Sequence, residues 1–378
     1  MMTKTLYKFL EIPCDIELAL KNFALENRVA VDLEADGLFS YRDKVCLIQI
    51  AGKQGVTIID PLKGAGALSG FKRLLEEREI LKVFHGGDYD IRLLKRDLGI
   101  KTVNIFDTMI ASQLLGKEAI GLGALLEEYF DIHTDKKFQK ANWSERPISG
   151  EMLEYAALDV SNLIELADIL KGELKAKGRL PWAEEEFSLM EQAEPPPQKE
   201  VSSFDVKGAG KFTPRQHAIL QCLLEVRDRV AAEWDRPPFK VISNKVFMEW
   251  AQNPPKNRRE IIETRGASKN ILAKLSDQLL AVIKSAESLP AEKLPKRPQF
   301  ERRPPLSGEE KKCLSALKEA RNKVSEELGI GGGLIVNSAT LENLARLEKD
   351  GAKELLEESL KGWQREVVGD ILLNIIQS

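Results

Sequence analysis

Apolar and polar positions in the first half of the chain follow two periods, one typical of strands and the other of helices. Apolar runs of strand length, rich in Val and Ile, occupy residues 28–34, 45–51, 55–61 and 81–86. Helical spacing occupies residues 67–80, 89–99 and 107–116, the last two with Gly99 and Gly116 as expected ends. Three successive strands followed by alternating helices and strands predict a mixed sheet covered by helices, which is an α/β architecture.

The pattern changes near residue 190. Residues 190–212 contain three consecutive prolines followed by serine and glycine, a composition that interrupts helices and is typical of a linker. Helical spacing without strands then covers residues 213–287. A second proline-rich segment, 288–307, is basic and precedes a last helical block over 308–378. We therefore predict an α/β domain followed by two small all-α domains, over residues 1–189, 211–287 and 307–378.

The two helical blocks resemble each other. Three residues of the first block recur in the second at an offset of 93 or 94 positions: Arg227 and Arg321, Val230 and Val324, Asn244 and Asn337. Any two amphipathic helices share some positions by chance. The common order of a helix, an apolar turn and a second helix nevertheless favours a tandem repeat.

Composition narrows the class of protein without identifying a function. A hydrophobic fraction of 43% and a charged fraction of 30% are those of an ordinary soluble globular protein. The net charge of −3 means that any nucleic-acid binding must come from local basic patches. No run approaches the roughly 20 apolar residues of a membrane span, and the N-terminus lacks the pattern of a signal peptide. The four scattered cysteines have no metal-ligand spacing, so we expect a reduced, cytoplasmic protein that does not bind membranes.

Three carboxylates alternate at Asp32, Glu34 and Asp36, where like charges repel unless water or a cation is close. Together with Gly37 and Asp43 they match the ligand count of an EF-hand calcium loop, but that loop lies between helices, whereas the flanking segments here are strand-like. A solvated strand end is a second alternative. The third is a catalytic metal centre, because a strand period of two points Asp32 and Glu34 to one face and their oxygens suit Mg²⁺ or Mn²⁺.

A centre with two cations needs further carboxylates from elsewhere in the fold. Asp88 and Asp90 lie at the start of the third predicted helix, where Asp88 fits the role of an N-cap. Tyr155 and Asp159 are four residues apart on a long helix predicted within residues 142–170, so a phenol and a carboxylate share one helical face. Taken alone, such a pair is more often a surface feature than part of a site.

Together, these carboxylates and Tyr155 resemble the motifs of a known family. Asp32-x-Glu34, Asp90 within "HGGDYDIRLL" and Tyr155-x-x-x-Asp159 resemble, in order and context, the motifs of the tyrosine subclass of the DEDD 3′–5′ exonuclease superfamily. The segments "DTMIASQLLG" and "ANWSERP" resemble the ribonuclease D family in particular, and the helical blocks resemble its HRDC domain, present twice. The resemblance extends over nearly the whole chain and implies a ribonuclease H-like mixed sheet with flanking helices.

The resemblance implies a role for each motif residue. Asp32, Glu34 and Asp159 would hold the cation that carries the attacking water. Asp32 and Asp90, directly or through water, would hold a second cation beside the leaving 3′ oxygen. Tyr155 would orient or deprotonate the water. The implied cofactors are thus two divalent cations, Mg²⁺ or Mn²⁺, which we also expect to stabilise the fold by separating clustered negative charges.

Asp88 and Asp90 are both candidates for one aspartate position of the family motif. The family motif has one aspartate where this chain offers both Asp88 and Asp90. Alignment on the following "RDLGI" places Asp90 at the family position and Asp88 at a variable one. His85 does not match the histidine base of the sister subclass, and we interpret it as structural.

The function implied is that of a metal-dependent 3′–5′ exoribonuclease, which trims the 3′ ends of tRNA precursors or other structured RNA and releases nucleoside 5′-monophosphates. No protein partner is inferred. An exonuclease that acts on DNA is an alternative that the motif residues do not separate. A non-catalytic RNA-binding scaffold is disfavoured because all five motif positions are filled.

Basic segments in the helical half suggest where RNA would bind. Residues 256–270 and 294–303 are rich in Arg and Lys, although such runs are as often simply solvated faces. RNA contacts there would involve phosphates and depend on salt. The second helical block is acidic and is expected to bind RNA less well. We expect the helical half to act as a tethered surface that raises the effective concentration of a folded RNA.

Overall fold

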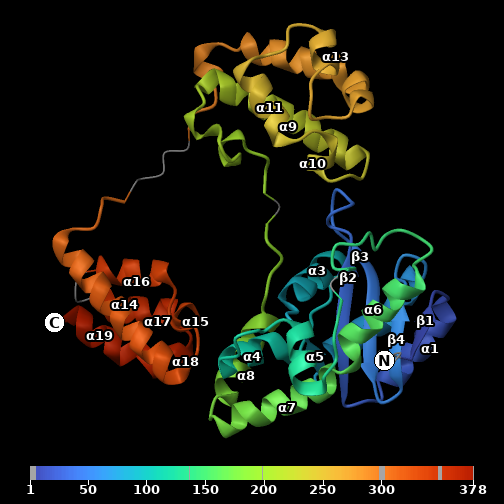
Figure 1. Cartoon of the computed structure of the whole chain (residues 1–378), viewed down its shortest axis with the longest axis vertical. Helices are drawn as coiled ribbons and strands as arrows, with labels where there is room; N and C mark the ends of the chain where they lie inside the picture. The colour runs from blue at the N-terminus through green and yellow to red at the C-terminus, as the bar shows by residue number, and fades with distance from the viewer. Residues whose placement is uncertain (1–5, 136, 198, 298–302, 348–350, 378) are drawn as a thin grey trace. The chain divides into compact units, whose positions relative to one another are not determined.

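The computed structural model describes the chain except for residues 1–5, 136, 198, 298–302, 348–350 and 378, and it divides into two compact units. The larger unit contains residues 1–34, 45–195 and 303–378, and the smaller one contains residues 35–44 and 196–302. Each unit has its own apolar core. Figure 1 shows the sheet and the helical blocks along the chain.

The larger unit is built on a six-stranded mixed sheet in the order β1-β4-β3-β2-β5-β6. Its strands are β1 (Tyr7–Leu10), β2 (Arg28–Ala35), β3 (Val45–Gly52), β4 (Gly55–Ile59), β5 (Leu81–Phe84) and β6 (Ile105–Asp107). Strand β5 is parallel to β2 and β6, whereas β3 and β4 are antiparallel. The four strands predicted from the sequence are confirmed as β2 to β5. The two edge strands were not predicted, because three or four residues carry too little periodicity.

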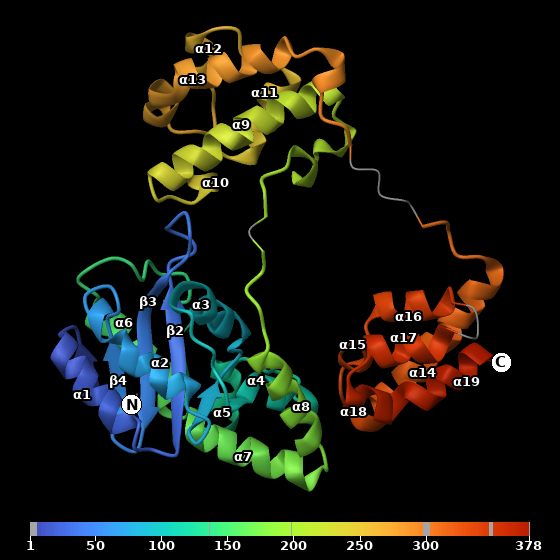
Figure 2. The same cartoon turned by 180° about the vertical axis from the view of Figure 1, so that it is seen from behind.

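Helices cover both faces of this sheet, and the predicted α/β class is confirmed. They are α1 (Pro13–Phe23), α2 (Leu68–Glu76), α3 (Asp88–Leu98), α4 (Thr108–Leu115), α5 (Leu122–Phe130), α6 (Gly150–Ser161), α7 (Leu163–Ala176) and α8 (Leu180–Glu191), with a 3-10 turn at Ala65–Ala67. Helix α6 lies over one face of the sheet and α2 over the other, as Figures 1 and 2 show from opposite sides. Gly99 and Gly116 end α3 and α4 in left-handed conformations, as predicted.

The expectation of one long helix within residues 142–170 is wrong. Residues 142–149 form a loop, and α6 begins only after Ser149, whose hydroxyl accepts a hydrogen bond from the amide of Met152. Asn162 has a non-helical backbone that separates α6 from α7. The hydroxyl of Ser161 donates to the side chain of Asn162, and such local polar contacts compete with helical hydrogen bonds. The pattern alone missed this break because apolar spacing continues across it.

The second helical block is part of the larger unit rather than a separate body. Its helices are α14 (Gly308–Leu328), α15 (Gly332–Ile335), α16 (Ser338–Ala345), α17 (Ala352–Ser359), α18 (Gly362–Gln364) and α19 (Asp370–Gln377), with a π-helical turn at Arg365–Gly369 between the last two. Apolar side chains of these helices form one continuous core with those of α4, α6, α7 and α8.

Specific contacts attach this block to α8. The indole rings of Trp363 and Trp182 stack with centroids 5.2 Å apart, and Nε1 of Trp363 donates to the carboxylate of Glu186 over 2.8 Å. The carboxylate of Glu185 accepts hydrogen bonds from the backbone amides of Gly362 and Trp363, which caps the start of α18. The expectation that the whole helical half is a tethered surface is therefore wrong for the second block.

We expect Trp363→Ala to destabilise the α/β domain although the residue lies in the C-terminal block. Removing a buried Trp of this kind costs about 3–5 kcal/mol, and the shared core transmits the loss to α8. Thermal unfolding of the α/β domain should therefore begin several degrees lower. Leu279→Ala is the matched control, because Leu279 is fully buried in the core of the smaller unit. Equal unfolding temperatures of the α/β domain in the wild type and in Trp363→Ala would show that the block does not support this domain.

The smaller unit holds the first helical block. Its helices are α9 (Pro214–Glu233), α10 (Pro238–Val241), α11 (Asn244–Gln252), α12 (Arg258–Ile262) and α13 (Lys269–Glu287), with 3-10 turns at Ser203–Asp205, Ala209–Lys211 and Ala291–Lys293. None of the helices described in the chain is long and apolar enough to cross a membrane.

The sequence repeat has a structural basis in both blocks. In the first, the guanidinium of Arg227 donates to the carbonyl of Ile242 over 2.9 Å and to the side chain of Asn244 over 2.6 Å. In the second, the guanidinium of Arg321 donates to the carbonyl of Val336. In each case the repeated arginine ties the long first helix to the turn that precedes the next long helix.

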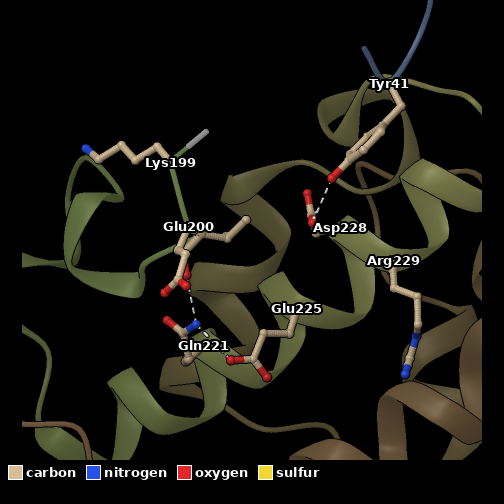
Figure 3. A pocket seen from close by; sticks show the side chains of 8 residues that line it. Tyr41, Lys199, Glu200, Gln221, Glu225, Asp228 and Arg229 are labelled. Carbon is tan, nitrogen blue, oxygen red and sulfur yellow. Dashed lines mark hydrogen bonds between the residues drawn. The ribbon is translucent and has the colours of Figure 1, made fainter. Parts of the chain in front are cut away.

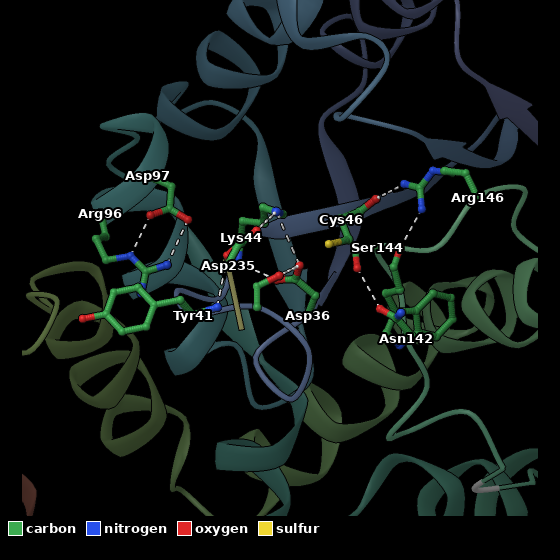
Figure 4. A network of polar contacts seen from close by, with 12 residues as sticks. Asp36, Tyr41, Lys44, Cys46, Arg96, Asp97, Asn142, Ser144, Arg146 and Asp235 are labelled. Atoms are coloured by element: carbon green, nitrogen blue, oxygen red, sulfur yellow. Dashed lines mark hydrogen bonds and ion pairs between the residues drawn. The ribbon is translucent and has the colours of Figure 1, made fainter. Parts of the chain in front are cut away.

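The smaller unit also contains the segment 35–44 and a polar pocket. The hydroxyl of Tyr41 donates to the carboxylate of Asp228 over 2.8 Å, and its backbone amide donates to Asp235 (Figures 3 and 4). The pocket in Figure 3 is lined by Tyr41, Lys199, Glu200, Val201, Gln221, Glu225, Asp228 and Arg229. None of the residues predicted for the site lines it, so we assign it no part in catalysis.

Candidate metal centre and active site

Three of the predicted carboxylates meet on one face of the sheet. Asp32 and Glu34 lie two residues apart on β2, so both side chains point to the same face. Asp159 lies on α6, which packs against β3 and β4. Each of the three residues offers an oxygen, and these oxygens all lie within 4.8 Å of one another. This arrangement can hold a cation.

Asp90 reaches the same region from another element. It is the third residue of α3, which follows β5, the parallel neighbour of β2. The turn between β5 and α3 uses Gly86 at φ 68°, a left-handed conformation in which a Cβ atom would also come within 2.8 Å of Met109. Asp90 is 8% exposed, and the negative charge of Asp32 acts on it.

Asp88 differs from Asp90 in its surroundings. Its side chain is 55% exposed and forms an ion pair with Arg92 over 2.8 Å. The expectation that Asp88 is the N-cap is wrong, because Gly87 holds that position and Asp88 is the first residue of the helix. A carboxylate in the first turn still interacts favourably with the helix dipole, which explains its preference for this position.

The electrostatics of the cluster favour a cation. Burial raises the pKa of Asp32 to about 7, and burial followed by the charge of Asp32 raises the pKa of Asp159. The pKa of Glu34 is raised by burial and then by Asp32, Asp159 and Asp90, and the pKa of Asp90 is raised by burial and then by Asp32 and Asp107. A divalent cation would replace the solvation that the carboxylates lose on burial and would reduce the repulsion between their charges. Hard carboxylate oxygens suit Mg²⁺ or Mn²⁺. The residues present therefore fit a divalent metal centre.

Tyr155 lies one helical turn before Asp159 on the same face of α6, as predicted. The rings of Phe138 and Trp143, from the loop before α6, pack against its ring with centroids 5.9 and 6.2 Å away. The Gln139 side chain forms a hydrogen bond with its hydroxyl. Burial, followed by the charge of Asp159, raises the pKa of Tyr155, so the phenol keeps its proton at neutral pH.

The loop that covers Tyr155 is anchored by Arg146. Its guanidinium forms a bidentate ion pair with the buried carboxylate of Asp60, over 2.6 and 2.9 Å. It also donates to the backbone carbonyls of Cys46, Trp143 and Glu145. Figure 4 shows Arg146 in this network beside the loop. Sequence reasoning used "ANWSERP" only for a family resemblance, and the partner Asp60 is 86 residues distant.

Asp107 is a buried carboxylate to which sequence reasoning gave no role. It is the N-cap of α4 and accepts hydrogen bonds from the amides of Ile110 and Gly87, over 2.9 and 2.8 Å. The second bond fixes the turn from which α3 starts, and the charge of Asp107 acts on Asp90. An aspartate just before a helical pattern is an N-cap signal, but nothing local indicates the contact with Gly87.

His85, interpreted from the sequence as structural, lies beside the first residue of α4. Its Nδ1 lies 2.9 Å from the hydroxyl of Thr108, which donates to the carbonyl of Phe84. Burial lowers the pKa of His85 to about 4, so the imidazole is neutral at pH 7.

The EF-hand alternative is wrong for the segment that follows β2. Strands β2 and β3 flank this segment, whereas an EF-hand loop needs two helices. Asp36 is fully buried and accepts hydrogen bonds from the hydroxyl of Ser40 and the amide of Lys44. Its oxygens therefore shape the loop itself.

We expect the metal-free protein to lose stability as the pH rises from about 4 to about 7. Carboxyls whose folded pKa is raised bind more protons in the folded state, so their contribution is fully present below the unfolded pKa and is lost as the pH rises to the folded pKa, which is about 7 for Asp32. Mn²⁺ should reverse this loss, and a concentration about 100 times its Kd should raise Tm by roughly 5–10 °C. The measurement is Tm in EDTA and in Mn²⁺ at pH 5 and pH 7.5. A rise that is equal at both pH values, or retained in Asp159→Asn, would contradict the assignment.

Comparison with known proteins agrees with both halves of the fold. A 3′–5′ exonuclease family matches residues 11–175, and the HRDC domain family matches residues 216–283 and 310–376. The two matches together include most of the α/β domain and nearly all of both helical blocks.

Individual relatives extend over nearly the whole chain. Ribonuclease D of Zymomonas mobilis is 28% identical over 356 residues, which cover 92% of this chain and 88% of the relative. The crystal structure of Escherichia coli RNase D, an exoribonuclease involved in structured RNA processing, has a TM-score of 0.72 and 25% identity, covering 98% of this chain and 99% of that one. A Bifidobacterium adolescentis protein has a TM-score of 0.86 at 24% identity over 98% of this chain and 97% of its own, which supports the fold alone.

Proposed function

Since the chain belongs to the ribonuclease D family and is a 3′–5′ exoribonuclease, we propose that it trims RNA 3′ ends with two divalent cations held by its acidic cluster. The observation that carries this proposal is the group of carboxylate oxygens from β2 and α6 within 4.8 Å of one another. Asp32, Glu34 and Asp159 would hold one cation, and Asp32 with Asp90 would hold the other.

The chemistry requires such a centre because a phosphodiester repels anionic nucleophiles and has a poor leaving group. When bound, two divalent cations lower the pKa of water, neutralise developing charge and stabilise the departing 3′ oxygen. The side chains of Asp32 and Glu34 are fixed by one strand, and that of Asp159 by one helix packed on the same sheet. These fixed positions support hydrolysis that releases nucleoside 5′-monophosphates.

Tyr155 would orient the attacking water. Its phenol shares the face of α6 with Asp159, and Phe138, Trp143 and Gln139 restrict its position. Because its pKa is raised, orientation through a hydrogen bond is favoured over abstraction of a proton.

Structured RNA, with tRNA precursors as one class, is the proposed substrate. The E. coli relative processes structured RNA. A folded RNA needs a binding surface beyond the site that holds its last nucleotides, and the first helical block offers a basic one. Residues 256–270 of that block contain the exposed cations Lys256, Arg258, Arg259, Arg265 and Lys269.

Part of this basic segment is already paired. Arg258 forms an ion pair with Asp277, and Arg259 with Glu263. In the described part of the chain, Lys256, Arg265 and Lys269 form no ion pair. These three cations are therefore the best placed to neutralise phosphates. The linker before α9 would make their contact with a bound RNA intramolecular.

We expect the triple change Lys256→Gln, Arg265→Gln, Lys269→Gln to lower kcat/KM on a structured RNA with a single-stranded 3′ tail. The tail alone should be cleaved at the wild-type rate, since it needs only the catalytic site. Losing three phosphate contacts should reduce the slope of log affinity against log salt by about 2 to 3. The matched control changes Lys311, Lys312 and Lys318 of α14 to Gln. An equal loss of kcat/KM on both substrates, or an equal loss in the control variant, would contradict the proposed RNA surface.

A further inference from the structure

Gln49 is fully buried, and neither of its amide atoms has a hydrogen-bond partner among the residues that the structure describes. A buried amide without a partner is unfavourable, because it has lost its hydrogen bonds to water without replacing them. Native proteins tolerate such a group where function requires it. Gln49 lies in the middle of β3 and has no part in the proposed mechanism.

The strand period shows which face of the sheet Gln49 occupies. Leu47 and Ala51 flank it at two residues on either side, and both belong to the core cluster formed with α6. Its register partner on β4, Ile58, belongs to the same cluster. Because side chains alternate along a strand and register partners share a face, Gln49 points toward α6.

Asp32 occupies the same face on the neighbouring strand. Ala30, two residues before Asp32 on β2, belongs to the same core cluster, and β2 lies next to β3 in the sheet. The carboxylate of Glu26, two residues before β2, accepts a hydrogen bond from the amide of Lys53, directly after β3, so the start of β2 lies at the level of the end of β3. Asp32 and Gln49 are therefore both near the middle of neighbouring strands and on the same face of the sheet.

We propose that Gln49 is a positioning residue of the metal centre, whose amide N–H orients the Asp32 carboxylate through one water. This inference rests on the proposed function. An oriented carboxylate presents a fixed oxygen to a cation, and hydrogen bonds to ligating carboxylates of this kind contribute about 10- to 100-fold to metal affinity. The unsatisfied amide then lowers the stability of the fold, while the oriented Asp32 carboxylate binds the cation more tightly.

The proposal predicts opposite effects on stability and on metal binding. Gln49→Met keeps the length and volume of the side chain and removes both polar atoms. The Tm of the metal-free protein should stay the same or rise, because no hydrogen bond between protein groups is lost. The Mn²⁺ affinity measured by titration calorimetry should fall about 10- to 100-fold, and the activity lost at low Mn²⁺ should return as Mn²⁺ is raised. Gln49→Leu should likewise lower the Mn²⁺ affinity without lowering the Tm of the metal-free protein.

Thr102→Val is the matched control. Thr102 is also fully buried, and its hydroxyl has no partner among the described residues. Thr102 precedes the first residue of β6, whereas α3 begins after the last residue of β5. Because β5 and β6 are parallel, Thr102 lies at the opposite end of these strands from the start of α3. Removing this unpartnered polar atom should leave both Mn²⁺ affinity and activity unchanged.

The outcomes separate this inference from the function on which it rests. Wild-type Mn²⁺ affinity in Gln49→Met overturns the role of Gln49 while leaving the centre intact. A fall in metal-free Tm in both Gln49 variants shows that the amide is a structural element of the core, and it also overturns the proposal. Failure of the wild-type protein to bind Mn²⁺, or unchanged Mn²⁺ affinity in Asp32→Asn, would instead contradict the proposed metal centre itself.

Discussion

Asp32→Asn and Asp159→Asn are each expected to abolish RNA cleavage while leaving RNA binding intact. Asn has nearly the volume of Asp, so each change removes the charge of a proposed ligand without opening a cavity. A metal centre contributes several kcal/mol of transition-state stabilisation, and losing it should lower the rate by roughly a thousandfold. The measurement is single-turnover cleavage of a labelled RNA in Mg²⁺, together with fluorescence anisotropy for binding.

The control for this experiment is Asp168→Asn. Asp168 lies on α7, is 55% exposed and pairs with Arg28 at the surface, so the same chemical change there should preserve activity. If folded Asp32→Asn or Asp159→Asn kept more than a few per cent of the wild-type rate, the assignment of these ligands would be wrong.

The second large effect separates two aspartates that are two residues apart. Asp90→Asn is expected to lower the rate at least about a hundredfold, because it removes a buried carboxylate that we propose positions a cation. Asp88→Asn should leave the rate nearly unchanged, since Asp88 is exposed and its pair with Arg92 contributes only about 0.2–0.5 kcal/mol. Single-turnover rates of the two variants, measured side by side, test the choice. The reverse ranking would mean that the motif has been placed two residues too far along α3.

Local periodicity was enough to place part of the site. A strand period of two puts Asp32 and Glu34 on one face, and the helical spacing of four puts Tyr155 and Asp159 on one face. The structure then brings the oxygens of Asp32, Glu34 and Asp159 together. The choice of Asp90 came from a family resemblance. The structure shows that Asp90 is buried and Asp88 exposed, but their roles stay predictions until the variants are measured.

Features that depend on distant residues were not predictable from pattern. The anchor between Arg146 and Asp60 joins residues from separate elements, and each residue alone has the signature of an ordinary loop position. The whole helical half, including the second block, was expected to be tethered because the linker at residues 190–212 is rich in proline. Its attachment to α8 depends on Trp363 and Glu186, which are 177 positions apart. Composition describes how a segment behaves locally, and it does not indicate which surfaces a block will bury.

The break at Asn162 and the edge strands illustrate a related limit. Apolar spacing continues through Asn162 because both α6 and α7 cover the same core. Strand β6 has three residues directly before α4, so its pattern merges with that of the helix. In both cases tertiary packing determines the boundary.

The most direct test is the product pattern from 5′-labelled single-stranded RNA and DNA of equal sequence, each in Mg²⁺, Mn²⁺ or EDTA. An exoribonuclease with a divalent metal centre should shorten the RNA from its 3′ end one nucleotide at a time and release nucleoside 5′-monophosphates. Cleavage of DNA should be slower, and EDTA should stop both reactions. Undiminished cleavage in EDTA, internal cuts, or faster cleavage of DNA than of RNA would contradict this function.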